Sequence, residues 1–134
     1  MYFRLPGPRI EVEPLLALAE TFDLTPGPGG SRMTDWQATK AVFESVLPTW
    51  GRRWLQAALV LLYPSSQLVG HADPPIEGGR YHLPLAQNED CWVFHDGTWQ
   101  QLQVGRWYKM DPALPHGAVN WGTTRRMHLL VDVD

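Results

Sequence analysis

The sequence predicts a mainly β protein, a jelly-roll sandwich or barrel of short antiparallel strands that follows a helical segment. After residue 54, short β-prone runs are separated by Pro, Gly, Asn and Asp at intervals of roughly ten residues, whereas residues 1–50 hold helical patterns. Helices that precede all the strands flank a sheet instead of alternating with its strands. We expect one domain over residues 1–134, with a helical preface in residues 1–50 and a jelly-roll core in residues 54–134.

Each predicted helix has its own start or stop signals. The segment Glu13–Phe22 is rich in Leu and contains no internal breaker, and the prolines and glycines of Thr25–Ser31 form a loop after it. Thr34 followed by Gln37 fits a capping box. Apolar residues then recur at helical spacing up to Pro48, which predicts a second amphipathic helix.

The candidate strands follow in chain order. They are Gln56–Tyr63, Val69–Asp73, Tyr81–Leu85, Cys91–Phe94, Thr98–Gln103, Trp107–Met110, Gly117–Trp121 and Arg126–Val133. The sequence His95-Asp96-Gly97-Thr98 between two of them has the Asp-Gly signature of a hairpin turn. No internal repeat and no linker to a second domain interrupts the series.

Composition argues against several classes of function. The formal net charge of −3 and the pI of about 5.9 do not suit a protein that neutralises a phosphate backbone. Cys91 is the single cysteine and cannot form an internal disulfide. The longest apolar run, Ala57–Tyr63, is too short to cross a membrane, and the N-terminal residues lack the apolar core of a signal peptide. We expect a cytoplasmic monomer or small homo-oligomer that binds neither nucleic acid nor membranes.

A His-X-Asp pair is the first indication of chemistry. Alternate side chains of a strand share a face, so His71 and Asp73 are expected to point the same way and to bind one cation. His116, after the rigid turn Asp111–Pro115, is the candidate third ligand. Two histidines and one carboxylate leave open positions on Fe(II), which a closed tetrahedral zinc site does not. His-X-Asp alone is a weak signal, because it recurs by chance.

Two Arg-X-His motifs lie on strands near this pair. Arg80 and His82 share one face of their strand, and Arg126 and His128 share one face of the last strand. A polar face on an isolated antiparallel strand is commonly a solvated one. Two such faces beside a metal motif favour a site instead. The apolar residues that we expect to face away from the pocket are Met127, Leu129 and Val131.

Other polar residues receive simpler interpretations. His95, in the predicted hairpin turn, is expected to be solvated. Cys91 is expected to be a small buried hydrophobic residue. Asp132 and Asp134 are expected to form a solvated acidic end of the chain.

Three segments together resemble the aspartyl/asparaginyl β-hydroxylase family, which includes relatives that hydroxylate free proline. The segments are HADPPIEGGRYHLPL, PHGAVNWGTTRR and MHLLVDVD. The distance from His71 to Arg80, the Arg-X-His motif at 80–82 and the ten-residue step from His116 to Arg126 all follow the family pattern. The resemblance covers the chain after the helical preface, and residues 1–50 carry no such resemblance.

This resemblance implies a double-stranded β-helix, a cupin-like fold, that binds Fe(II) and 2-oxoglutarate, activates O2 and hydroxylates an unactivated carbon. The residues that match its metal-binding positions are His71, Asp73 and His116. Arg126 matches the arginine that pairs with the distal carboxylate of 2-oxoglutarate, a role that suits a planar, permanently charged guanidinium. Arg80 and His82 match positions near the carboxylates of the cosubstrate and the substrate, and the resemblance does not show which of them they contact. The substrate class it implies is a small molecule or a peptide side chain.

The chain departs from the family pattern at two positions. The aspartyl β-hydroxylases have glycine where Asp73 stands, so this sequence looks closer to the members that keep a full triad, which weakens the case for a peptide-aspartate substrate. The hydroxyl residue that those enzymes place on the strand before the first ligand corresponds to Val60 here. The hydroxyl residues nearby are Tyr63, Ser65 and Ser66.

Two other functions stay open at this point. The first is a cupin-like module that binds a metal or a small ligand without oxygen chemistry. The second is a metal-dependent isomerase or lyase on the same jelly roll, because a fold does not fix a function. Only the oxygenase requires Arg126 to hold 2-oxoglutarate, so binding of 2-oxoglutarate separates the first alternative from it.

Overall fold

A computed structural model describes residues 1–134 of the chain. Its helices are α1 (Glu13–Ala19) and α2 (Trp36–Phe43), and its 3₁₀ turns are Pro28–Gly30 and Glu44–Val46. Its strands are β1 (Phe3–Arg4), β2 (Ser31–Met33), β3 (Trp54–Leu62), β4 (Ser66–His71), β5 (Arg80–Ala86), β6 (Cys91–His95), β7 (Thr98–Gln100), β8 (Tyr108–Met110), β9 (His116–Asn120) and β10 (Arg126–Val133). Every predicted strand therefore has a counterpart.

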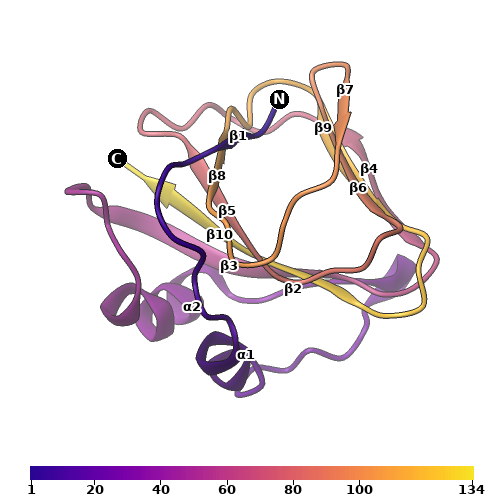
Figure 1. Cartoon of the computed structure of the whole chain (residues 1–134), viewed down its shortest axis with the longest axis horizontal. Coiled ribbons are helices and arrows are strands. Elements are labelled where there is room, and N and C mark those ends of the chain that lie inside the picture. Colours follow the sequence, from indigo (N-terminus) through magenta and orange to yellow (C-terminus); the bar gives the residue numbers. More distant parts are fainter.

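The strands form two antiparallel sheets that face each other (Figure 1). The six-stranded sheet has the order β1-β8-β5-β10-β3-β2, and the four-stranded sheet has the order β4-β9-β6-β7. The strands β1 and β2 were not predicted and lie within the expected helical preface, where they pair with β8 and β3. The mainly β, jelly-roll class predicted from the sequence is confirmed, although residues 1–50 contribute strands as well as helices.

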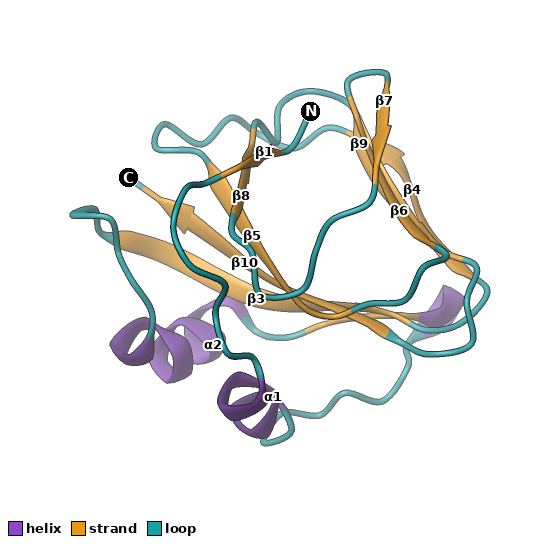
Figure 2. Cartoon of the chain, in the orientation of Figure 1, coloured by secondary structure: helices purple, strands orange, loops and turns teal.

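The large apolar core lies outside the sandwich, between the six-stranded sheet and the helices (Figure 2). One face of β10 enters this core, which confirms the predicted orientation of its apolar residues. These residues are Met127, Leu129 and Val131, joined by Tyr81 and Leu83 of β5 and by Leu15 and Phe43 of the helices. The alternation of a strand turns the opposite face of β5 and β10 into the space between the sheets. That space holds a smaller apolar cluster of seven buried residues, so much of its surface is left to polar groups.

The predicted cap of the second helix is wrong by one residue. Asp35, not Thr34, caps α2, because its carboxylate accepts the backbone N–H groups of Gln37 at 3.1 Å and Ala38 at 2.8 Å. Thr34 is buried, and its hydroxyl accepts the N–H of Leu59 at 2.8 Å instead. Asp and Thr are both good capping residues, so sequence spacing alone did not choose between neighbours.

The hairpin between β6 and β7 is confirmed, but its histidine is not solvated. Asp96 and Gly97 have positive φ values of 47° and 85°, as a tight two-residue hairpin requires. His95 is the last residue of β6 and shares its inward face with Cys91, whose predicted burial is confirmed. His95 is only 2% exposed, and its Nε2 lies 2.8 Å from the carbonyl oxygen of Asp111.

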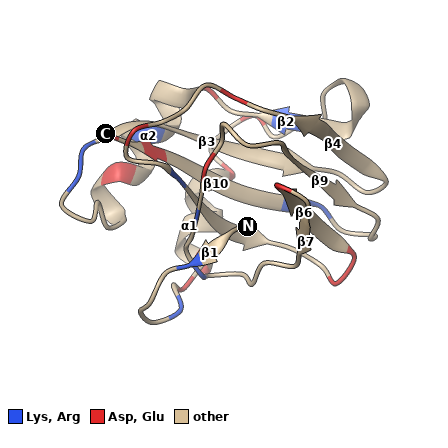
Figure 3. Cartoon of the chain, turned by 90° about the horizontal axis from the view of Figure 1, so that it is seen from above, with Lys and Arg blue, Asp and Glu red and all other residues tan.

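Charged residues are dispersed over several elements and both signs occur near one another (Figure 3). No helix of the structure has the length and apolar character needed to cross a membrane. Asp134 is exposed and pairs with Arg53 at 3.2 Å, whereas Asp132 is completely buried. The expectation of a solvated acidic end is therefore wrong for Asp132, because the alternation of β10 turns its side chain inward with that of Arg126.

Candidate metal centre and its cavity

Two histidines face each other where β4 and β9 pair. His71, the last residue of β4, is in register with His116, the first residue of β9, and their ring centroids are 4.4 Å apart. The strands come unusually close beside this pair, since a Cβ placed on Gly117 would lie 2.7 Å from the carbonyl oxygen of Leu68. The absence of a side chain at Gly117 therefore allows the two histidine-bearing strands to approach each other.

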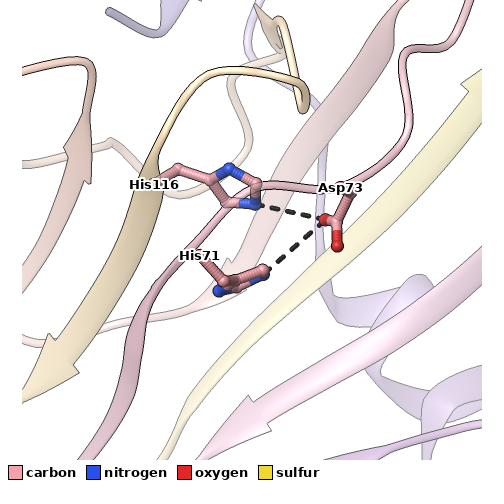
Figure 4. Close-up of side chains that lie close together, drawn as sticks. All are labelled: His71, Asp73 and His116. Atoms are coloured by element: carbon pink, nitrogen blue, oxygen red, sulfur yellow. Dashed lines mark ion pairs between the residues drawn. The ribbon is translucent and has the colours of Figure 1, made fainter.

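Asp73 joins the histidines from a loop and not from a strand. The predicted strand Val69–Asp73 extends too far, because two prolines follow and β4 ends at His71. The Asp73 N–H donates to the carbonyl oxygen of Pro112 at 2.8 Å, which ties this loop to the one that precedes β9. Its Oδ2 lies 3.6 Å from Nε2 of His71 and 3.3 Å from Nε2 of His116 (Figure 4). The shared-face argument was wrong, although the three residues do converge.

Hydrogen bonds to the backbone set the orientation of both imidazole rings. Nδ1 of His71 lies 2.8 Å from the carbonyl oxygen of Val69, and Nδ1 of His116 lies 2.8 Å from that of Leu114. Because a carbonyl only accepts, each Nδ1 carries a proton, so that Nε2 is the nitrogen whose lone pair a metal ion would use. Burial lowers the pKa of His116, which favours the neutral form.

The resulting donor set fits a metal ion. Two Nε2 lone pairs and the Asp73 carboxylate converge, and the three ligand atoms lie within 4.8 Å of one another. Three acceptors repel one another unless a cation lies between them. Neutral imidazole and carboxylate suit a divalent transition metal, and only three protein ligands leave coordination positions open.

The three side chains open into a cavity of about 560 Å³ between the sheets. His71 and His116 stand on the four-stranded sheet, whereas Arg80 and Arg126 line the cavity from the six-stranded sheet. The cavity therefore has one wall with the candidate metal ligands and one wall with two arginines. Its size is within the usual range for sites that take small molecules.

Arg126 is a buried cation without a partner. The residue is 2% exposed, and its Nε and Nη1 atoms make no hydrogen bond. Burial lowers its pKa to about 10, partly opposed by Tyr2 and Cys91. A buried guanidinium without an anion is costly for the folded protein, and it is well suited to a bidentate carboxylate ligand.

Arg80, in contrast, has two carboxylate partners, Asp132 and Asp73. Its Nε and Nη2 donate to the two carboxylate oxygens of Asp132 at 2.7 and 3.1 Å. Its Nη1 donates to Oδ2 of Asp73 at 3.0 Å. Arg80 therefore orients one of the metal-ligating groups, as an outer partner of a metal ligand commonly does.

His82 belongs to a chain of hydrogen bonds that fixes its tautomer. The side-chain amide of Gln87 donates to the carbonyl of Leu102, so its Oε1 accepts from Nε2–H of His128 at 3.0 Å. Nδ1 of His128 then accepts from Nδ1–H of His82 at 3.4 Å. Burial lowers the pKa of both histidines well below the usual value, so both stay neutral. Nε2 of His82 is left as an unpartnered acceptor at the cavity wall.

Tyr2 is the cavity residue that the sequence did not indicate. It is 4% exposed, lines the cavity, and packs edge-on against His82 with ring centroids 5.0 Å apart. Burial raises its pKa to about 12, and the charges of Arg126 and Arg80 oppose this rise. The hydroxyl is therefore protonated at neutral pH and within the electrostatic influence of the two arginines. A two-residue edge strand near the N-terminus has no periodicity from which its position could have been predicted.

Val60 stands where the family places a hydroxyl residue, and none of the neighbouring hydroxyl residues Tyr63, Ser65 and Ser66 lines the cavity in its place. Val60 lines the cavity with an apolar side chain, and the Tyr63 hydroxyl donates to the carbonyl of Leu24 instead. Tyr2 is the only hydroxyl-bearing residue among those that line the cavity. Of the predicted site residues, the structure thus brings together His71, Asp73, His116, Arg126, Arg80 and His82.

A family model described as aspartyl/asparaginyl beta-hydroxylase matches residues 31–134. The chain belongs to the aspartyl/asparaginyl β-hydroxylase family. The family suspected from the sequence is confirmed, and the match extends upstream of the region that carried the resemblance. All three candidate metal ligands and Arg126 lie within the matched region, whereas Tyr2 and α1 lie outside it.

Solved structures of cupins share the fold of this β-hydroxylase family member. A Cupin 2 conserved barrel domain protein from Salinispora arenicola CNS-205 has a TM-score of 0.54 and 11% identity, over 97% of this chain and 91% of that chain. Oxalate oxidase in complex with the substrate analogue glycolate has a TM-score of 0.54 and 17% identity, over 80% of this chain and 53% of that one. Salicylate 1,2-dioxygenase from Pseudoaminobacter salicylatoxidans has a TM-score of 0.53 and 15% identity, over 88% of this chain and 29% of that one.

The chain therefore spans about half of the oxalate oxidase chain and less than a third of the dioxygenase chain. At these identities the likeness shows a cupin-like fold alone. No curated protein matches the chain.

Proposed function

We propose that this protein is an Fe(II)- and 2-oxoglutarate-dependent dioxygenase that hydroxylates a small molecule or a peptide side chain. One observation carries the proposal: the unpartnered guanidinium of Arg126 lines the same cavity as three converging metal-ligating groups. The guanidinium suits an anion, and the three ligating groups suit a cation. A dicarboxylate that chelates Fe(II) through one end and pairs with Arg126 through the other supplies both.

The iron would be held by His71, Asp73 and His116. Three protein ligands leave room for a bidentate cosubstrate and for O2. Iron bound there supplies the activation of oxygen. In the balanced reaction, 2-oxoglutarate, O2 and a substrate C–H group give succinate, CO2 and an alcohol, with one oxygen atom entering succinate and the other entering the product.

The other polar residues of the cavity bind 2-oxoglutarate or orient the Asp73 carboxylate. Arg126 pairs with the distal carboxylate of 2-oxoglutarate, and the protonated hydroxyl of Tyr2 donates a hydrogen bond to the same carboxylate. Arg80 holds the Asp73 carboxylate toward the histidines through the 3.0 Å contact of its Nη1. The burial of Arg126 and His82 excludes water from this end of the cavity, which strengthens each of these interactions.

A titration without oxygen tests the proposal. The protein is loaded with Zn(II), a redox-inert metal, and 2-oxoglutarate binding is measured by calorimetry with and without the metal. We expect binding that requires the metal, and succinate formation once Fe(II) and O2 replace Zn(II) and the inert atmosphere. Absence of 2-oxoglutarate binding to the metal-loaded protein would contradict the proposal and favour the cupin-like binding module. Substrate turnover without oxygen consumption would favour the isomerase or lyase.

A further inference from the structure

The second arginine of the cavity, Arg80, is already paired with two carboxylates of the protein. Its Nε and Nη2 atoms are taken by the two oxygens of Asp132, and its Nη1 by Asp73, at distances of 2.7 to 3.1 Å. The ring of Trp36 lies 5.5 Å from the guanidinium carbon of Arg80 and covers its face. Each nitrogen of this guanidinium therefore already has a carboxylate partner.

The pair between Arg80 and Asp132 is fixed in place. Asp132 is 0% exposed, and its Oδ2 also accepts from Nε2 of Gln56 at 2.8 Å. A substrate that displaced Asp132 from Arg80 would leave a completely buried carboxylate without its charged partner, which is strongly unfavourable. The positive charge of Arg80 is thus already balanced inside the protein, and only one N–H of Nη1 and one of Nη2 remain for another acceptor.

No positive charge in the cavity remains uncompensated once the cosubstrate is bound. Under the proposed function Arg126 is occupied by 2-oxoglutarate, and His82 presents a lone pair that repels an anion. The two arginines balance Asp73 and Asp132, and the divalent metal balances the dianionic cosubstrate. A substrate carboxylate would therefore add one uncompensated negative charge to a largely dry site.

The rest of the cavity wall is mostly apolar. Met33, Trp36 and Ile76 line it together with Pro74 and Leu68, and Gln56 adds one amide. We infer that the group hydroxylated here is an uncharged aliphatic one and not a carboxylate-bearing side chain. This inference rests on the proposed function, because the charge balance includes the metal and 2-oxoglutarate.

Binding to the complex with Zn(II) and 2-oxoglutarate tests the inference. The probes are the N-acetyl α-amides of leucine, asparagine and aspartic acid, which have side chains of similar size and different polarity and charge. Calorimetry without oxygen should show the leucine compound binding at least tenfold more tightly than the aspartic acid compound, with the asparagine compound between them. An aspartic acid compound that binds as tightly as either neutral one overturns the inference, as does a leucine compound that does not bind. Free leucine as a fourth probe tests the argument about carboxylates: its α-carboxylate should weaken binding relative to the leucine compound, and equal affinity would contradict the inference that no cation remains for a substrate carboxylate.

Two variants test which residues cause the difference in affinity between the probes. Asp132→Asn releases one edge of Arg80 and should tighten binding of the aspartic acid compound at least tenfold, while the leucine compound changes less than threefold. Trp36→Ala should weaken the leucine compound about fivefold and leave 2-oxoglutarate binding unchanged; unaltered leucine affinity would contradict the assigned wall. If Asp132→Asn does not fold, the affinities of the probes for the wild type and for Trp36→Ala still test the inference. A wrong proposed function can be distinguished from a wrong substrate class, because in that case 2-oxoglutarate does not bind even before any probe is added.

Discussion

Replacing Arg126 by Met should have opposite effects on the protein alone and on its complex. Burial lowers the Arg126 pKa from 12.5 to about 10, which corresponds to about 3 kcal/mol against the charged form in the folded protein. Because the pKa is lower in the folded state, this penalty applies at every pH below about 10. Arg126→Met removes the penalty and breaks no hydrogen bond of Nε or Nη1, so the free energy of unfolding should rise, by up to about 3 kcal/mol.

The same substitution should remove most of the stabilisation by 2-oxoglutarate. Truncating one partner of a buried charge pair costs about 2 to 5 kcal/mol, so the dissociation constant should rise at least tenfold. In the wild type loaded with Zn(II), 2-oxoglutarate at a hundred times its dissociation constant should add about 2.7 kcal/mol to the unfolding free energy. Arg126→Lys should restore only part of the affinity, because an ammonium cannot reproduce the bidentate fork.

Urea unfolding of both proteins, with and without 2-oxoglutarate, measures both effects. Arg125→Met is the matched control, because the neighbouring Arg125 pairs with Glu20 at the surface with 32% of its side chain exposed. It should leave 2-oxoglutarate affinity unchanged. Wild-type stabilisation by 2-oxoglutarate in Arg126→Met would move the carboxylate site to another cation. A marked loss of stability in the ligand-free variant would show that Arg126 is satisfied in the folded protein.

Three further outcomes are expected. Asp73→Ala removes the only charged metal ligand, so calorimetry should show weaker Zn(II) binding; unchanged affinity would place this carboxylate outside the coordination sphere. Tyr2→Phe should weaken 2-oxoglutarate binding about fivefold, the effect of about 1 kcal/mol for one hydrogen bond, with the same Zn(II) affinity; equal 2-oxoglutarate affinity would refute its role. The pKa values of His82 and His128 are well below 6.5 in the folded protein, so these two histidines do not lower its free energy of unfolding above pH 6.5. This free energy should fall below that pH, by up to about 1.4 kcal/mol per pH unit for each histidine, and urea unfolding from pH 5 to 7.5 should show this slope or disprove the neutral pair.

The sequence predicted those parts of the site that follow from strand alternation. The inward direction of Arg126 and the outward direction of Met127 come from a long central strand with a clear period of two, which tertiary structure cannot easily override. Asp132 lies on the same inward face, whereas the sequence predicts a solvated end, because its partner Arg80 is distant in sequence. The ion pair between Arg80 and Asp132 can therefore be predicted only when the register between β5 and β10 is known.

Other features had no local signal at all. Tyr2 precedes β1, and its backbone N–H and C=O groups are held by the side-chain amide of Gln100 in β7, a contact that no local pattern indicates. Asp73 reaches the histidines through a loop, held by a backbone contact with Pro112 that no spacing rule describes. In both cases the missing information was a long-range contact and not a residue preference.

The division of the cavity between two sheets has a consequence for inactivation. The two candidate histidine ligands stand on one sheet and Arg126 on the other, and Arg80 of the second sheet forms an ion pair with Asp73 in the loop that follows β4. Each sheet keeps its own backbone hydrogen bonds when the layers separate slightly, so its strand content is preserved. The distance between metal and guanidinium is not preserved, because neither sheet fixes it alone. Under the proposed function, heating should therefore abolish 2-oxoglutarate binding at a lower temperature than it abolishes the circular dichroism of the strands, since the site is lost by local opening before global unfolding.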